Sequence, residues 1–305
     1  LRNFVGPGMT PDVGELLKYA ERAEELGFES VWVWDHLLLG VKPAFPILDS
    51  LTVLAAIASR TNRIKLGTSV LIMPLRNPLV LAKVLATIDH ISNGRLILGT
   101  AAGWYAREFD AAGVSFKQRG SIFERNLDLV LKLWSEYSVT AEVDNLIFRN
   151  ATLLPKPLQN PRPPVLIGGY ADVVLRRVAR LADGWLTYFY TPEGFKSSWN
   201  KILAYASGYG RDPNLLQATN ELAIFVGPPA EKAKPIMREW LTTEWDISRG
   251  SDSTLDHAIH GTPDECAEQL QPHLTSGVER IVLIPYHYDP EQVELIAKEV
   301  IPRLK

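Results

Sequence analysis

The sequence predicts an α/β fold, a TIM (β/α)8 barrel that forms a single domain over residues 1–305. Three observations support it: short apolar runs alternate with helical patterns, eight such runs can be counted, and 305 residues suit one large barrel. Several runs are almost continuously apolar, as expected of parallel strands that helices cover on both faces. A doubly wound open sheet is the alternative, but the length and the number of strands favour the barrel.

Each expected strand is a short run rich in apolar or β-branched residues, and a helical pattern follows it. In chain order the strands are expected at residues 1–5, 30–34, 64–71, 95–99, 165–168, 184–188, 222–226 and 280–284. Residues 12–26 illustrate the helical pattern, because their apolar members recur on one helical face. Thr10 and Pro11 supply a cap and a first-turn proline, and Gly27 supplies a stop.

Two segments are longer than a minimal barrel needs, so we expect insertions before strand five and between strands seven and eight. The first, residues 137–164, holds two short β-like pieces and five prolines, which indicates a hairpin followed by an extended arm. The second, residues 243–260, is polar and rich in Ser, Asp and His. We expect it to be a mobile excursion that could serve as a lid over a binding site.

The composition indicates which kinds of partner the protein can bind and which cellular compartment it suits. Lys and Arg number 32 and Asp and Glu number 35, so the net charge of −3 offers no basic field for nucleic acid. No run of 18 or more apolar residues predicts a membrane span, and residues 1–5 do not resemble a signal peptide. The single cysteine, Cys266, excludes an intrachain disulfide and a cysteine-built zinc site. We therefore expect a cytoplasmic protein that acts on a small molecule.

The active site of a TIM barrel lies at the carboxyl ends of its strands, so the residues that follow each run are the candidates. They are rich in aromatic residues and glycines and poor in acids. They include Asp35-His36, Met73 to Arg76, Thr100 to Tyr105, Gly168-Gly169-Tyr170, Tyr188-Phe189-Tyr190 and Pro285 to Tyr288. Such a rim suits a flat, partly apolar ligand, and it suits Mg²⁺ poorly because that ion prefers carboxylates.

Asp35 and His36 are the best catalytic candidates. A histidine can hold or release a proton near neutral pH, and a neighbouring carboxylate can set its tautomer. Adjacent residues of a strand point to opposite faces, so Asp35 need not contact the His36 ring. A histidine that merely ends a strand is the alternative, and the spacing alone leaves both readings open.

Gly168, Gly169 and Tyr170 lie between an expected strand and a helix that begins near Ala171. Backbone N–H groups at a helix start can bind a phosphate, and glycine lets the anion approach closely. A tight turn is the alternative. The glycines at 99 and 103 lack the three-glycine fingerprint, so a Rossmann dinucleotide site is poorly supported.

Two other motifs point away from rival chemistries. His257 and His260 have a spacing that could present two nitrogens to zinc, but no third ligand is evident nearby. We therefore expect no metal. The absence of a Gly-x-Ser-x-Gly elbow counts against a serine hydrolase.

Ordered sequence blocks run along nearly the whole chain. They are AEELGFESVWVWDH at 23–36, TNRIKLGT at 61–68, ATIDHISNGRLILG at 86–99, GWY at 103–105 with EF at 108–109 and GV at 113–114, LPKP at 154–157, IGG at 167–169, ADGW at 182–185 and GTPDE at 261–265. In this order they resemble the luciferase-like monooxygenases, TIM-barrel enzymes that use reduced FMN or the deazaflavin coenzyme F420. The blocks indicate the family and not a substrate.

The resemblance implies roles for the candidate residues. His36 looks like the catalytic histidine after strand two, and Asp35 favours the deazaflavin branch, in which an Asp-His pair occurs. Ser69 and Val70 resemble the strand-three bulge, a non-proline cis peptide behind the flavin ring. The remaining cofactor contacts implied by the resemblance are Gly103 and Trp104 beside the ring and Gly168, Gly169, Tyr170 and Ala171 at the phosphate.

The chain departs from two branches of the family. The deazaflavin sugar-phosphate dehydrogenases carry a glutamate acid where this chain has Trp104 and a tryptophan where it has Gly40, so that reaction is not expected. Bacterial luciferase has an arginine near the position of Ala102 and Glu-His-His in place of residues 34–36, so a long-chain aldehyde substrate is equally unsupported.

The expected function is that of a two-component oxidoreductase or monooxygenase acting on a small organic substrate. A separate reductase would supply the reduced FMN or F420, because no NAD(P)H fingerprint is present. Reduced FMN would react with oxygen, whereas the deazaflavin would transfer a hydride directly. The resemblance also implies a homodimer or higher oligomer. The alternatives are a metal-dependent TIM-barrel hydrolase and a non-catalytic flavin-binding barrel.

Overall fold

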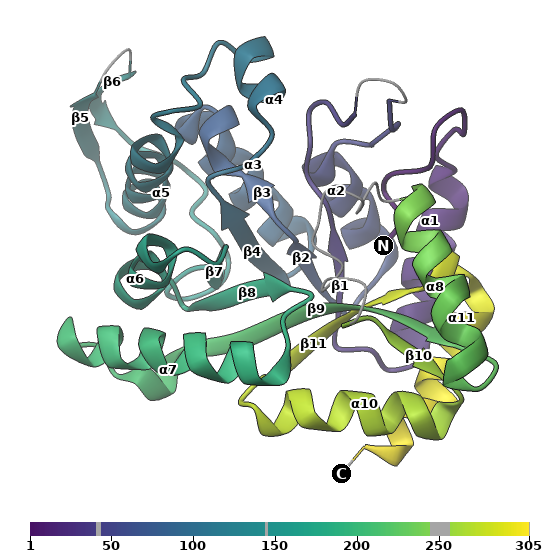
Figure 1. Cartoon of the computed structure of the whole chain (residues 1–305). Coiled ribbons are helices and arrows are strands. Elements are labelled where there is room, and N and C mark those ends of the chain that lie inside the picture. Colours follow the sequence, from purple (N-terminus) through teal and green to yellow (C-terminus); the bar gives the residue numbers. More distant parts are fainter. Residues whose placement is uncertain (41–43, 144–145, 245–256, 305) are drawn as a thin grey trace.

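A computed structural model describes residues 1–40, 44–143, 146–244 and 257–304 (Figure 1). The strands are β1 (Ser30–Val33), β2 (Lys65–Thr68), β3 (Leu71–Ile72), β4 (Leu96–Ala101), β5 (Val139–Val143), β6 (Leu146–Ala151), β7 (Val165–Gly168), β8 (Gly184–Tyr188), β9 (Gln217–Val226), β10 (Ile259–Gly261) and β11 (Arg280–Pro285). The helices are α1 (Val13–Glu25), α2 (Ser50–Arg60), α3 (Pro78–Ile91), α4 (Ala106–Ala111), α5 (Arg119–Ser135), α6 (Asp172–Leu181), α7 (Pro192–Gly208), α8 (Ala230–Glu244), α10 (Pro263–Thr275) and α11 (Pro290–Leu295).

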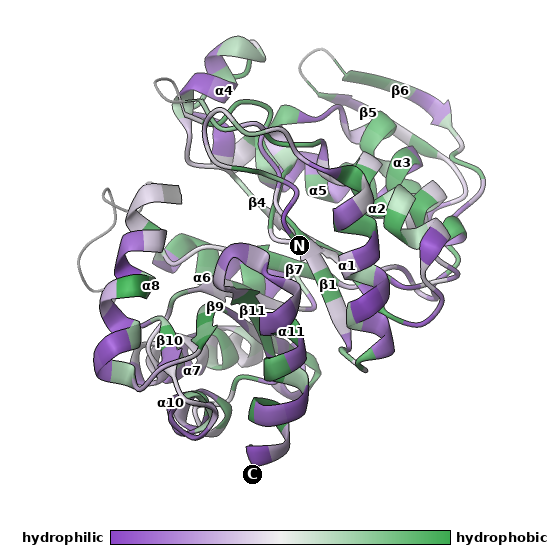
Figure 2. Ribbon diagram, turned by 90° about the vertical axis from the view of Figure 1, so that its right-hand side faces the viewer, coloured by the Kyte–Doolittle hydropathy of each residue, from purple (hydrophilic) through white to green (hydrophobic). Residues whose placement is uncertain are grey.

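Within the part of the chain just given, nine strands form one curled sheet, and every pairing in it is parallel. The order runs β1-β2-β4-β7-β8-β9-β10, with β11 on β9 and β3 on β4. Helices surround the strands, and α1, α8 and α11 carry hydrophilic residues on the outside of the molecule (Figures 1 and 2). The α/β architecture with a curled parallel sheet is therefore the one expected.

The helices begin where short polar side chains cap them. The side chains of Asp12, Asp49 and Asn77 accept backbone N–H groups in the first turns of α1, α2 and α3. Pro78 then occupies the first turn of α3, where its missing N–H costs nothing. No helix among the described residues combines the length and the apolar composition that crossing a membrane requires.

The expected strand at residues 1–5 is wrong as a regular strand. Phe4 makes one isolated bridge to Ile47, and the side chain of Asn3 takes the place of a ladder partner. Its amide donates to the Trp34 carbonyl at 2.7 Å, and its carbonyl oxygen accepts from the Trp34 N–H at 3.0 Å. The Asn3 side chain thus takes both backbone hydrogen-bonding groups of Trp34, just beyond the end of β1. The segment therefore runs beside β1 without forming a ladder.

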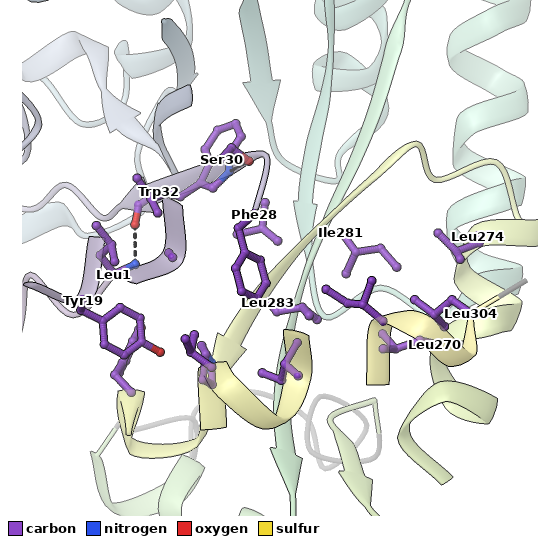
Figure 3. A pocket seen from close by; sticks show the side chains of 18 residues that line it. Leu1, Tyr19, Phe28, Ser30, Trp32, Leu270, Leu274, Ile281, Leu283 and Leu304 are labelled. Atoms are coloured by element: carbon purple, nitrogen blue, oxygen red, sulfur yellow. Dashed lines mark hydrogen bonds between the residues drawn. The ribbon is translucent and has the colours of Figure 1, made fainter. Parts of the chain in front are cut away.

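Consequently, no ladder joins β11 to β1 among the described residues, and these two strands are edges of the sheet. An apolar groove of about 270 Å³ lies between them, floored by α10 and the C-terminal turns (Figure 3). The backbone nitrogen of Leu1 donates to the Trp32 carbonyl at the side of the groove. The lining of the groove reaches Pro285 and Tyr288, but it includes neither His36 nor the turn at Gly168.

Several strand boundaries differ from the expected ones by one or two residues, and three differences are larger. The run at 64–71 divides into β2 and β3. Strand β9 begins at Gln217, five residues before the expected run, because the polar residues Asn220 and Glu221 are buried within it. The short β10 was not expected, and it pairs with the end of β9. The error at β9 arises because polar residues occupy an interior strand and interrupt the apolar pattern.

The hairpin expected within residues 137–164 is confirmed, since β5 and β6 pair antiparallel between α5 and β7. The excursion expected at 243–260 falls mainly on residues 245–256, outside the described residues, and so does its proposed role as a lid.

Side chains that point inward fill the centre of the sheet. Trp32, Ile97, Leu166, Leu186 and Val282 form one buried cluster from five different strands. The Trp32 ring lies over Gly67, where a Cβ atom would come within 2.2 Å of it. Glycine at this position therefore lets a large ring close the barrel interior below the candidate site.

Candidate active site

His36 lies just beyond the carboxyl end of β1, and its ring is held by a carboxylate that the sequence did not single out. Its Nδ1 atom is 2.8 Å from Oε1 of Glu108, a fully buried residue of α4. The other Glu108 oxygen accepts the N–H group of Leu37 at 2.7 Å. An ionised carboxylate can only accept, so beside it Nδ1 donates, and the Nε2 atom of a neutral ring then keeps its lone pair.

Asp35 faces a different set of partners. Its buried carboxylate accepts hydrogen bonds from Ser50 Oγ at 2.8 Å, from the Ile72 N–H at 2.9 Å and from Arg76 at 2.6 Å. These contacts tie the end of β1 to α2 and to the turn after β3. The acidic partner that orients His36 is therefore Glu108, which is 72 residues away in sequence, and spacing alone gives no signal for such a pair.

Gly103 and Trp104 come from the loop after β4 and lie beside His36. The Trp104 ring is edge-on to the His36 ring, with centroids 5.9 Å apart, and 63% of Trp104 is exposed. Gly103 has φ +82°, and a Cβ there would come within 2.9 Å of Phe109. Glycine is thus required for the turn that presents a large, solvent-facing indole next to the histidine.

Ser69 and Val70 lie between β2 and β3, and the peptide bond that joins them is cis, as the family resemblance implies. Val70 lies against Gly168 at the end of β7, where an added Cβ would be 3.0 Å from Val70 Cγ1 and 3.6 Å from Ala101 Cβ. The structure therefore brings Val70 and Gly168 together from segments about 100 residues apart. A side chain at Gly168 would fill the space above Val70.

The turn at 168–171 leads into α6. Gly169 has φ +128°, and its carbonyl accepts the indole N–H of Trp185 at 2.8 Å. Tyr170 donates its hydroxyl to the Tyr188 carbonyl at 2.7 Å. Ala171 occupies the cap position and has no side chain that can accept, so no side chain caps the first-turn N–H groups of α6. Such groups can bind an anion.

Glu221 is the second functional candidate that the sequence did not reveal. It lies in β9 and is 4% exposed; Trp34 donates its indole N–H to Oε1 at 3.0 Å, and Ser69 shares a hydrogen bond with Oε2. Burial raises the pKa of its carboxyl group, and the two hydrogen bonds oppose that rise. The sequence does show a glutamate directly before an apolar run. Because the expected strand began at residue 222, Glu221 was not counted as a strand residue.

Aromatic residues at the ends of β8 and β11 adopt an unusual backbone conformation. Phe189, His287 and Tyr288 have φ values of 51°, 50° and 54°. Bulky residues rarely occupy this left-handed region, and where they do they often mark functional loops. Together with Tyr188 and Tyr190, they make this side of the rim aromatic.

The chain thus has an α/β fold with a curled parallel sheet, and a His–Glu pair lies at the carboxyl ends of its strands. The family profile described as luciferase-like monooxygenase matches residues 2–280. The chain belongs to this family.

Characterised relatives include enzymes of two cofactor classes. The chain is 28% identical to an F420-dependent glucose-6-phosphate dehydrogenase of Amycolatopsis mediterranei, over 95% of this chain and 94% of that protein. It is 27% identical to an FMNH(2)-dependent dimethylsulfone monooxygenase of Pseudomonas fluorescens, over 94% and 86%. These relatives are oxidoreductases, which favours that class over a metal-dependent hydrolase.

Solved structures agree on the fold. The oxygenating constituent of 3,6-diketocamphane monooxygenase from Pseudomonas putida, a type II Baeyer-Villiger monooxygenase in complex with FMN, superimposes with a TM-score of 0.82. The match is 18% identical and covers 98% of this chain and 96% of that one. In the described part of this chain, no group of three or more His, Cys, Asp or Glu side chains could hold a metal ion.

Proposed function

We propose that this protein is an oxidoreductase that uses a dissociable reduced cofactor, FMNH2 or reduced F420, to oxidise or reduce a small organic substrate. The observation that carries the proposal is the His36–Glu108 pair beside an exposed tryptophan, at the same end of the sheet as the Ser69–Val70 segment and the Gly168 turn. Relatives of both cofactor classes cover nearly the whole chain.

The residues present fit a flat ring with a phosphate tail. Gly168 leaves space above Val70 that a Cβ would fill, and the uncapped start of α6 offers N–H groups. We assign the ring to Ser69, Val70, Gly103 and Trp104. We assign the phosphate to the turn formed by Gly168, Gly169, Tyr170 and Ala171. When bound, the group supplies either hydride transfer or activation of oxygen.

His36 would hold or deliver one proton at the substrate through Nε2. Glu108 accepts the hydrogen on Nδ1 and so fixes both the tautomer and the ring orientation. Leu37 and Leu38 each donate a backbone N–H to the same carboxylate, which keeps it in place. We assign Asp35 a supporting role, because it holds the strand end on which His36 is mounted.

The proposal includes the remaining expected features of a two-component system. A separate reductase would supply the reduced cofactor, and the chain would act as one domain in a homodimer or higher oligomer. The aromatic rim and Trp104 would exclude water from the bound ring.

The test is an anaerobic titration of the purified protein with reduced FMN and, separately, with reduced F420, followed by tryptophan fluorescence. We expect one of the two to quench the signal saturably, because Trp34 and Trp104 lie at the proposed site. Binding of neither cofactor, together with a tightly bound divalent metal ion, would contradict the proposal and favour the hydrolase. Cofactor binding without any turnover would indicate the non-catalytic barrel.

A further inference from the structure

Glu221 connects three separate segments at the centre of the sheet. In the register of β9 it lies beside Tyr188 of β8 and Val282 of β11. Its side chain spans the interior to Trp34, which follows β1, and to Ser69, which follows β2. The buried carboxyl group of Glu221 thus links Ser69, which we propose to contact the cofactor, to β9 on the opposite side of the sheet.

The hydrogen bonds around Glu221 can be satisfied completely by the uncharged acid. The indole N–H of Trp34 donates to one carboxyl oxygen, which can be the carbonyl oxygen. The other oxygen can then donate its own hydrogen to Ser69 Oγ, which is both a donor and an acceptor. Both side-chain partners of Glu221 are neutral groups.

Among the residues that the structure describes, neither side chain that hydrogen-bonds to Glu221 carries a positive charge. Tyr170 and Tyr188 also face Glu221. Burial raises the pKa of both phenols, so they stay neutral. Val282 is apolar. A buried carboxylate without a charged partner is costly, which favours the acid.

We propose that Glu221 is a positioning residue for the reduced cofactor: as the uncharged acid it fixes Ser69 against Trp34 and keeps the floor beneath the ring free of negative charge. The inference rests on the proposed function, since it takes the ring to lie over Ser69 and Val70. A reduced flavin or deazaflavin ring readily loses a proton and becomes an anion, and its phosphate is anionic as well. A carboxylate directly beneath it would repel the ring in a poorly solvated site.

The consequence is a pH dependence of a defined sign. Since burial raises the pKa of Glu221, the acid persists to higher pH than an ordinary glutamate, and it ionises as the pH rises further. If only the acid form binds well, the apparent dissociation constant rises by up to about tenfold per pH unit above that pKa. Glu221→Gln retains one acceptor and one donor, cannot ionise, and therefore mimics the acid at every pH.

The experiment measures the dissociation constant of the reduced cofactor by anaerobic fluorescence titration from about pH 6 to about pH 9 at fixed ionic strength. It compares the wild-type protein, Glu221→Gln and a control, Glu142→Gln, which changes an exposed carboxyl on the β5–β6 hairpin. Ionisation of the cofactor affects all three proteins, so only the difference between their profiles reports Glu221. Thermal unfolding of each variant checks that the fold is retained.

We expect affinity to fall with rising pH in the wild type and in Glu142→Gln, and Glu221→Gln to hold the low-pH wild-type affinity throughout. Superimposable profiles for all three proteins would overturn the inference, as would a folded Glu221→Gln variant that binds at least tenfold more weakly than the wild type at low pH. Failure of the wild type to bind either cofactor at any pH would instead refute the proposed function, so the two failures are distinguishable.

Discussion

Asp35 and His36 are neighbours in sequence, yet they belong to two different regions of the molecule. The Asp35 carboxylate is enclosed by Ser50, Ile72 and Arg76, and its hydrogen bonds serve to join structural elements. His36 has one ring nitrogen held by Glu108, which leaves the other for chemistry. The difference lies in the hydrogen bonds: those of Asp35 are all directed to structural elements, whereas the His36 ring, which we propose as the proton-handling group, has one nitrogen outside the bond to Glu108.

The largest effect should come from His36 itself. We expect His36→Asn to lower the rate of turnover by about 10²–10⁴-fold, because it removes the group that handles the proton. Binding of the reduced cofactor and thermal stability should change little. The matched control is His90→Asn on α3, an exposed histidine whose Nε2 lies 2.8 Å from the Lys156 carbonyl. Single-turnover kinetics under anaerobic mixing measure the rate, and equal rates for both variants would contradict the assignment.

On the structural side of the comparison, Arg76→Leu should lower the free energy of unfolding by about 3–5 kcal/mol, because it leaves the buried Asp35 carboxylate without its cation. The control is Arg60→Met, which breaks an exposed pair with Glu21 and should cost about 0–1 kcal/mol. Urea denaturation measures both. If Arg76→Leu were as stable as the control, the Asp35 network would not be structural.

A smaller effect on rate is expected from Glu108→Gln. The amide would donate toward Nδ1 and so favour the tautomer with the hydrogen on Nε2, which removes the free lone pair. We expect turnover to fall by about tenfold to a hundredfold. An unchanged rate of turnover, compared with the exposed control Glu231→Gln, would show that Glu108 only fills space.

The smallest effect is on stability and concerns His273, a buried histidine. Burial is the main cause that lowers its pKa to about 4, and nearby His257 contributes. The unfolded chain therefore binds a proton between about pH 6.5 and about pH 4 that the folded protein does not, so the stability should fall as the pH drops through this window. Urea denaturation of His273→Gln should show a flatter pH dependence than the wild type, and an equally steep one would contradict the explanation.

The sequence predicted most of the fold because local patterns carry it. Apolar runs at 165–168 and 184–188 coincide with β7 and β8, and the proline-rich segment after α5 contains the expected hairpin. The run at residues 1–5 failed because the side chain of Asn3, instead of a backbone ladder, satisfies the end of β1. A pattern of apolar residues cannot reveal that a side chain takes the place of a backbone partner.

The candidate site was predictable only in part. His36, Trp104 and Gly168 follow strands, and their positions mark them as rim residues. Glu108 and Glu221 depend on contacts between segments 72 and 152 residues apart, so no local pattern could connect them to His36 or Ser69. The apolar groove between β1 and β11 does not mark the site either, since its lining contains neither His36 nor Gly168.

The central claim is that a reduced cofactor lies across the carboxyl ends of the strands. A crystal structure of the protein with reduced FMN or reduced F420, grown and frozen without oxygen, tests it most directly. We expect ring density against Ser69 and Val70, with His36 at its edge and the phosphate at Gly169 to Ala171. Well-defined cofactor density in the apolar groove beside Leu1 and Phe28, with none at the mouth, would contradict it.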